Sequence, residues 1–181
     1  MPAIPDELLN TAVGVLAADP TASMQEIAEA AGISRATLNR RFAGREDLLR
    51  AIAEWAVGRM EEIATEIDRQ GLTGRPAIEV LLENAVALAP KIGFLINECS
   101  LENDEAFMGR VDAALSRWHN WIEEGQRRGE FRVDLPAVWI AGAIEGLVVA
   151  LFHGIRRGLI APVDGLRLIR LTLLEGVVSR A

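Results

Sequence analysis

The sequence predicts an all-α protein with an N-terminal three-helix domain containing a helix-turn-helix, residues 1–50, and a larger helical domain, residues 51–181. Two observations lead to this prediction. Apolar residues recur every three or four positions along most of the chain, which is the period of a helix with one buried face. No segment alternates apolar and polar residues between turn signals, as a strand would. A chain of 181 residues is long enough to bury a sizeable core.

Residues 23–42 contain the strongest local signals in the chain. Ser23 is followed three residues later by Glu26, a capping box that predicts the start of a helix. Gly32 is placed to end that helix, and Ser34 suits the cap of the next one. The segment therefore predicts two short helices joined by a glycine-containing turn.

The second of these helices is expected to have two different faces. Leu38 and Phe42, four residues apart, point one way into a core. The opposite face, which points into solvent or toward an anionic partner, carries Arg35, Ala36, Asn39 and Arg40. A helix-turn-helix with such a face suits the major groove of DNA.

Four blocks of the first third of the chain resemble the TetR family of bacterial transcriptional regulators. In order they are an amphipathic segment from Leu8 to Leu16 and the segments Ile27 to Ser34, Thr37 to Phe42 and Arg45 to Leu49. The chain departs from the family pattern at Asn39, where a phosphate-touching tyrosine is usual. The connection from Asp19 to Ala22 is also shorter than usual and lacks the common glycine.

This resemblance implies a homodimeric DNA-binding regulator, most simply a repressor of a palindromic operator that an unknown small-molecule inducer releases. We expect the DNA-binding residues to be Ser34, Arg35, Ala36, Thr37, Asn39, Arg40, Arg41 and Arg45. Arg35, Ala36 and Arg40 suit base edges, since an arginine fork bonds guanine and an alanine methyl contacts thymine. Thr37, Asn39, Arg41 and Arg45 suit phosphates, although Asn39 could instead bond adenine.

The formal net charge of −7 does not exclude DNA as a partner. Residues 33–45 contain Arg35, Arg40, Arg41 and Arg45 and no acid, a local charge of +4. A local basic patch is sufficient for phosphate contact, because net charge mainly governs solubility and nonspecific association.

The larger domain is expected to consist of helices throughout. One helix runs from Glu46 to about Ile67, a second from Pro76 to a break at Pro90, and a third from Asp104 or Glu105 to Gly125–Gly129. Residues 130–136 resemble the loop that precedes the last two long helices in the family. Those helices, 136–158 and 162–180, are apolar around most of their circumference.

Two apolar faces on each of the last two helices indicate burial against both their own domain and a partner chain. The expected dimer interface consists of Gly142, Gly146, Ala150, Ile169, Leu173 and Val177. The alternative is a monomeric bundle in which both helices are internal.

The resemblance also implies a small-molecule site between helices of the second domain. Its expected lining is Met60, Ile63, Phe94, Asn97, Phe107, Val111, Trp118, Trp139 and Glu145. An apolar stripe is equally consistent with an ordinary core. Asn97 and Glu145 are the candidate polar anchors, because a polar group on an apolar face needs a partner.

The remaining signals narrow the class of protein. His119 and His153 lie far apart, no nucleotide-binding or hydrolase motif occurs, and Cys99 is a lone cysteine, so we expect no enzyme activity, metal or cofactor. We also expect no membrane-spanning run and no signal peptide, and hence a cytoplasmic protein. Two alternatives remain: an all-α ligand-binding or interaction protein whose helix-turn-helix no longer binds DNA, and, more distantly, a helical-bundle enzyme.

Overall fold

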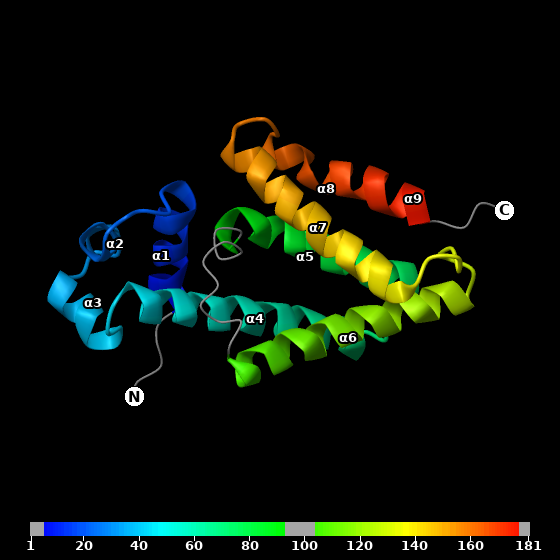
Figure 1. Ribbon diagram of the computed structural model, residues 1–181, viewed down its shortest axis with the longest axis horizontal. Coiled ribbons are helices and arrows are strands. Elements are labelled where there is room, and N and C mark those ends of the chain that lie inside the picture. The colour runs from blue at the N-terminus through cyan, green and yellow to red at the C-terminus, as the bar shows by residue number, and fades with distance from the viewer. Residues whose placement is uncertain (1–5, 93–103, 178–181) are drawn as a thin grey trace.

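The structure is a computed structural model that describes residues 6–92 and 104–177, with the backbone alone at 89–92 and 177. Its described residues form helices and no β-strand, which confirms the all-α prediction. Figure 1 shows an elongated molecule, with three short helices at one end and a bundle of longer helices at the other.

The small end consists of α1 (Asp6–Ala18), α2 (Met24–Ala30) and α3 (Arg35–Arg41). The predicted capping box is present, because the Ser23 hydroxyl accepts from Glu26 N–H at 3.3 Å and the Glu26 carboxylate accepts from Ser23 N–H at 2.7 Å. The Ser23 hydroxyl also donates to this carboxylate, and the two bonds donated by Ser23, from its N–H first, hold the pKa of Glu26 below its usual value. Ser34 caps α3 by accepting from Thr37 N–H at 3.1 Å. Local chemistry therefore starts both helices.

The helix α4 (Arg45–Arg69) joins the two ends of the molecule. Near its start, Leu48 and Ile52 are fully buried in a core shared with α1, α2 and α3. Near its end, Ala64 and Ile67 are fully buried in a second core, within the larger bundle. One continuous helix thus belongs to both cores.

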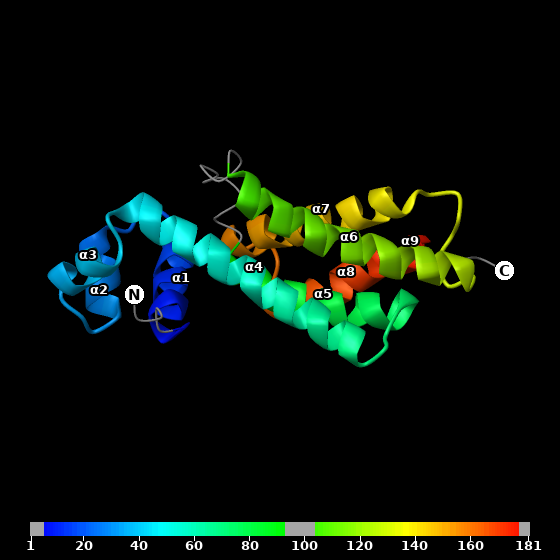
Figure 2. The same cartoon turned by 90° about the horizontal axis from the view of Figure 1, so that it is seen from below.

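Three long helices pack around the second core: α5 (Gly74–Ile92), α6 (Glu105–Arg127) and α7 (Ala137–Arg156). Figure 2 shows α6 running alongside α4. The predicted helix break at Pro90 is wrong, because α5 continues to Ile92. Proline removes one main-chain hydrogen bond and crowds the carbonyl four residues earlier, and here only two helical residues follow it.

The last helical segment begins at Pro162, as predicted, with a 3₁₀ turn (Pro162–Asp164). It continues as α8 (Gly165–Ile169), a π-helical turn (Arg170–Leu174) and α9 (Glu175–Val177). Ile169, Leu173 and Leu174 are buried in the second core.

One residue of the larger bundle is buried in the small domain. Phe152, near the end of α7, is 3% exposed and belongs to the core formed by α1, α2, α3 and the start of α4. In addition, α1 packs on α5. The two ends of the molecule are therefore held together by more than α4.

The corner where α5 begins and α6 ends depends on a close approach of two glycines. A Cβ atom at Gly125 would lie 2.5 Å from the ring of the buried Phe131, and one at Gly74 would lie 3.1 Å from Gly125 Cα. Gly74 has a φ of +62°, a conformation that favours glycine. The carboxylate of Glu130 crosses the corner and accepts from Arg75 N–H at 2.7 Å.

We expect Gly125→Ala to lower the free energy of unfolding by about 1–3 kcal/mol, because the added methyl group has no space against Phe131. Gly109→Ala is the matched control on α6, since nothing lies within 4 Å of a Cβ there. The control should raise the free energy of unfolding by roughly 0.5–1 kcal/mol, the usual helix preference for alanine. Urea denaturation followed by circular dichroism measures the free energy of unfolding of both variants. Equal changes in the two variants would contradict the close packing at this corner.

Candidate nucleic-acid interface and effector domain

The helix α3 lies at the outer end of the small domain (Figure 1). Its inner face is anchored by Leu38, which is fully buried, and by Phe42 just after its end, 2% exposed. Its outer face carries Arg35, Ala36, Asn39 and Arg40, all exposed, as predicted. Two cations, one amide and one methyl group are therefore presented together by a rigid helix.

Hydrogen bonds orient part of this surface. The Thr37 hydroxyl lies 2.9 Å from the Ser34 hydroxyl and accepts from the guanidinium of Arg40 at 3.1 Å. Thr37 is half-buried, whereas Ser34 is exposed. Arg40 is thus held along α3 and retains further N–H donors for a partner.

Arg41 and Arg45 are half-buried and differ from the outer arginines. The guanidinium of Arg45 donates to the main-chain oxygens of Ala22, at 2.6 Å, and Pro20. These bonds join α4 to the turn between α1 and α2. Two donors of its fork therefore already bond carbonyl groups within the domain, its remaining N–H groups stay available, and the phosphate contact expected of Arg45 stays a prediction.

The same turn is stabilised by Asp19. Its carboxylate accepts from the Thr21 hydroxyl at 2.7 Å and from Thr21 N–H at 2.8 Å. These bonds, with a smaller contribution from the charge of Arg45, hold the pKa of Asp19 below its usual value. Asp47 accepts from Ala43 N–H at 2.9 Å, just before α4 begins. Asp19 and Asp47 therefore stabilise the turns on either side of the helix-turn-helix.

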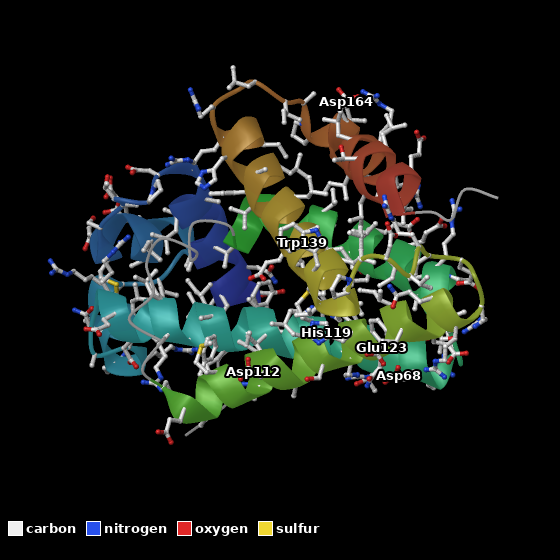
Figure 3. The ribbon with its side chains drawn as sticks, turned by 45° about the vertical axis from the view of Figure 1, so that its right-hand side comes forward. Asp68, Asp112, His119, Glu123, Trp139 and Asp164 are labelled. Carbon is white, nitrogen blue, oxygen red and sulfur yellow. The ribbon has the colours of Figure 1, made fainter. Side chains whose placement is uncertain are left out.

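The residues expected to line an effector site divide into two groups. Met60 and Ile63 of α4 and Phe107 and Val111 of α6 are half-buried, and Trp118 of α6 is buried. Trp139 and Glu145 of α7 are instead exposed on the surface of the domain, and Trp139 is 67% exposed (Figure 3). Phe94 and Asn97 lie outside the described residues.

Trp139 and Glu145 correct the expected lining. Because α7 is apolar on most sides, its sequence does not reveal which side faces inward. Trp139 and Glu145 lie on the outer surface, away from the buried positions, which are Ile140, Ala141, Ile144, Leu151 and Phe152. Glu145 is therefore no anchor for a ligand inside this domain.

A different polar group stands out in the second core. The indole N–H of Trp118 is buried and has no hydrogen-bond partner among the residues that the structure describes. By contrast, the indole of Trp121, one turn further along α6, donates to Asp68 at 2.9 Å. A buried donor without a partner is unfavourable by about 1–3 kcal/mol. Sequence reasoning included Trp118 for its bulk and missed its unpaired donor.

The residues expected at a dimer interface are also of two kinds. Gly142, Gly146 and Ala150 of α7 are exposed, and nothing lies within 4 Å of a Cβ built at either glycine. Ile169 and Leu173 are 2% and 3% exposed, in the chain's own core, which corrects their expected role at the interface. The side chain of Val177 lies outside the described residues. On this segment Leu171 is exposed instead.

The outer face of α7 is apolar over much of its length. By length and composition α7 could cross a membrane, contrary to the sequence-based expectation that no segment approaches such a span. Only 33% of the most apolar 18-residue stretch of this helix is buried, although α7 packs on α5 and α6. Val138 and Trp139 are 63% and 67% exposed at its first turn. A large part of this helix therefore has no covering partner within the described chain.

Comparison with known proteins agrees with this architecture. Residues 8–52 match the family model of bacterial regulatory proteins of the tetR family. The chain is 30% identical over 158 residues to the transcriptional repressor LfrR of Mycolicibacterium smegmatis, covering 84% of this chain and 79% of LfrR. The chain belongs to the TetR family. The family assignment makes it a DNA-binding transcriptional regulator, as the helix-turn-helix predicts.

Two further transcriptional regulators and a crystal structure of LfrR resemble it over nearly their whole length. NfxB of Pseudomonas aeruginosa, an HTH-type transcriptional regulator, is 26% identical over 97% of this chain and 96% of NfxB. The crystal structure of LfrR from Mycobacterium smegmatis in complex with proflavine superposes with a TM-score of 0.73, at 25% identity over 96% of each chain. KstR2 of Mycobacterium tuberculosis has a TM-score of 0.74 at 16% identity, covering 96% of this chain and 94% of KstR2, which is a likeness of fold alone.

Proposed function

We propose that this protein is a cytoplasmic, homodimeric repressor that binds a palindromic operator and is released from it by a small molecule. Residues 1–50 would form the DNA-binding unit and residues 51–181 the ligand-binding and dimerisation unit. The observation that carries the proposal is the exposed face of α3, with Arg35 and Arg40 projecting from a helix whose other face is buried. Its relatives are named as regulators, so we propose no enzyme activity.

The exposed side chains divide by chemistry. Arg35 and Arg40 would bond guanine in the major groove, and the Ala36 methyl would contact thymine. Ser34, Thr37 and Arg41 would contact phosphates beside the groove. The side-chain amide of Asn39 would form two hydrogen bonds with adenine or, alternatively, one with a phosphate.

We expect Arg40→Ala to weaken binding to the preferred duplex by about 1–3 kcal/mol and to relax the preference at one base pair. The reason is the loss of one bidentate base contact. A duplex selected by the wild-type protein from a random library, titrated by fluorescence anisotropy, measures both quantities. Arg69→Ala, an exposed cation at the far end of α4, should bind like the wild type.

Equal loss of affinity on every duplex would assign Arg40 to a phosphate instead. Failure of the wild-type protein to select any sequence would favour the alternative, a helical protein whose helix-turn-helix no longer binds DNA.

The dimer is proposed to form through the outer face of α7. Gly142, Gly146 and Ala150 follow one another at four-residue spacing on the exposed side of the helix, where a partner helix could approach closely. The exposed Leu171 adds an apolar side chain on the last helical segment. Dimerisation would bury an apolar surface that is large for a soluble monomer.

Gly146→Leu is expected to convert the dimer into a monomer at micromolar concentration, because the new side chain would push a partner helix away. The fold of each chain should be unaffected, since nothing lies within 4 Å of a Cβ at this position. Sedimentation velocity measures the state of association and circular dichroism measures the fold. Gly109→Leu on α6 is the control and should remain dimeric, whereas a monomeric wild-type protein would exclude the dimer.

The effector site is proposed to lie beside Trp118, between α4 and α6. Met60 and Ile63 from one helix and Phe107 and Val111 from the other supply half-buried apolar surface. The unpaired N–H of Trp118 would be satisfied by a hydrogen-bond acceptor on the ligand. No acid is fully buried among the described residues, so the site suits a neutral, mostly apolar molecule with one acceptor.

Two tricyclic probes of similar shape can test this chemistry: acridone, which is neutral and carries a carbonyl acceptor, and proflavine, the cation bound by LfrR. We expect acridone to raise the melting temperature more than proflavine at equal concentration, and to weaken binding to the selected duplex. Trp118→Phe removes the donor and keeps most of the ring, so it should abolish this preference. No thermal shift with either probe, or the same preference in Trp118→Phe, would contradict the site.

A further inference from the structure

The hydroxyl group of Thr37 is bonded differently from those of other helical threonines in this chain. The hydroxyls of Thr11 and Thr65 donate to the carbonyl oxygens four residues earlier, at 2.9 and 2.7 Å. Such a bond is common for a threonine inside a helix. Thr37 lies in the first turn of α3, and its hydroxyl lies 2.9 Å from the hydroxyl of Ser34, the cap of the same helix. The Thr37 hydroxyl is therefore bonded to a side chain instead of a carbonyl group.

Arg40 completes a chain of three polar side chains along α3. Side chains on a helix lean toward its N-terminus, so Arg40 reaches back over the residue three positions earlier. Its Nη2 donates to the Thr37 hydroxyl at 3.1 Å. The Ser34 hydroxyl in turn accepts from Thr37 N–H at 3.1 Å, which holds it at the start of the helix. The guanidinium of Arg40 is therefore connected, through two hydroxyl groups, to the cap of α3.

The two hydroxyl groups keep one hydrogen for a partner. The Thr37 oxygen accepts from Arg40, and one hydrogen joins the two hydroxyls, whichever of them donates it. The remaining hydroxyl hydrogen, from Ser34 or from Thr37, is available to a phosphate. The phosphate contact proposed for these residues is thus compatible with the bond to Arg40, and it would come from one hydroxyl group at a time.

The bond to Thr37 also leaves Arg40 able to bond a base. A guanidinium has two forks, one formed by Nε and Nη2 and the other by Nη1 and Nη2. Nη2 has one hydrogen in each fork, so a single bond from Nη2 to Thr37 occupies one fork and leaves the other complete. One complete fork is what the O6 and N7 atoms of guanine require.

Arg35 provides a comparison within the same helix. It is exposed, like Arg40, and it belongs to the same outer face of α3. Between residues that the structure describes, no hydrogen bond is donated by the Arg35 guanidinium, whereas Arg40 donates to Thr37. Of these two outer arginines, Arg40 is therefore the one that is oriented before DNA is present.

We propose that Thr37 is a specificity-determining residue that acts through Arg40: its hydroxyl, held by Ser34, orients the guanidinium so that one complete fork faces a single base pair. A long side chain that is ordered before binding loses less conformational entropy when it bonds the matching base. On a duplex without that base the orientation brings no such advantage. Thr37 thus influences the choice of base without touching one. The orientation of Arg40 needs no DNA, whereas its effect on base choice rests on the proposed function.

The free protein tests the orientation of Arg40. Nitrogen-15 relaxation of the arginine Nε–H groups measures how strongly each guanidinium is ordered. We expect a higher order parameter for Arg40 than for Arg35, and Thr37→Val should lower the value for Arg40 by about one third without changing that for Arg35. Valine has nearly the shape of threonine, so circular dichroism should show the wild-type helix content. Equal order parameters of the two arginines in the wild-type protein, or no change in Thr37→Val, would overturn the positioning.

Base preference tests the consequence for DNA binding. We compare duplexes that differ at the base pair where Arg40→Ala relaxes the preference. Thr37→Val should reduce that preference by about threefold to tenfold, the cost of ordering one long side chain, while Thr37→Ser keeps most of it. Thr11→Val is the matched control and should bind like the wild type, because it removes another half-buried threonine hydroxyl of the same domain.

Two outcomes of these titrations would overturn the role of Thr37 in base choice. The first is a loss of affinity by the same factor on every duplex, in Thr37→Val or in Arg40→Ala, since this indicates a phosphate contact. The second is an undiminished effect of Thr37→Val in the Arg40→Ala background, where the group that Thr37 positions is absent. If the wild-type protein selects no duplex, the proposed function and the role in base choice both fail, and the relaxation measurements still decide whether Thr37 orders Arg40.

Discussion

The structure depends on the fact that α4 is a single helix buried in two cores. Leu48 and Ile52 complete the small domain, and Ala64 and Ile67 belong to the larger bundle. A domain of about 50 residues has little interior of its own, so the apolar face that α4 adds is a large part of it. An uninterrupted helix is stiff along its axis. A change in the bundle that moves α4 therefore reaches α3 without any further moving part.

Local signals in the sequence were sufficient for most of the helices, although not for the end of α5 beyond Pro90, and they were not sufficient for the orientation of the helices. The cap formed by Ser23 and Glu26 could be predicted because it depends on residues three apart. The inward face of α7 could not, because its apolar residues surround the helix. The exposure of Trp139 on α7 was missed for this reason, and so was the burial of Ile169 on the equally apolar last segment. Hydrophobicity predicts that a side chain avoids water, but only the packing of the helices determines which surface covers it.

On the DNA-binding face, too, local signals predicted part of the arrangement and contacts between distant residues determined the rest. Arg35 and Arg40 are exposed as predicted, because Leu38 and Phe42 determine which side of α3 is buried. The bonds from Arg45 to two main-chain oxygens were not predicted, since the fork that suits a phosphate also suits carbonyl groups brought near by the fold. The unpaired donor of Trp118 and the bonds that Asp68 accepts from Arg117 and Trp121 depend on how helices distant in sequence pack together, which no local signal predicts.

Phe152 has a consequence for how such proteins can be divided or recombined. It comes from α7, yet it fills part of the interior of the domain that carries the recognition helix. A fragment that ended near residue 50 would lack this ring and would leave a cavity among the side chains of α1, α2 and α4. Vacancies of that size typically destabilise a core by about 3–5 kcal/mol. If the DNA-binding domain were exchanged between relatives, the incoming domain would have to accommodate the aromatic ring of Phe152 in its core. The two parts of the chain are therefore constrained to diverge together.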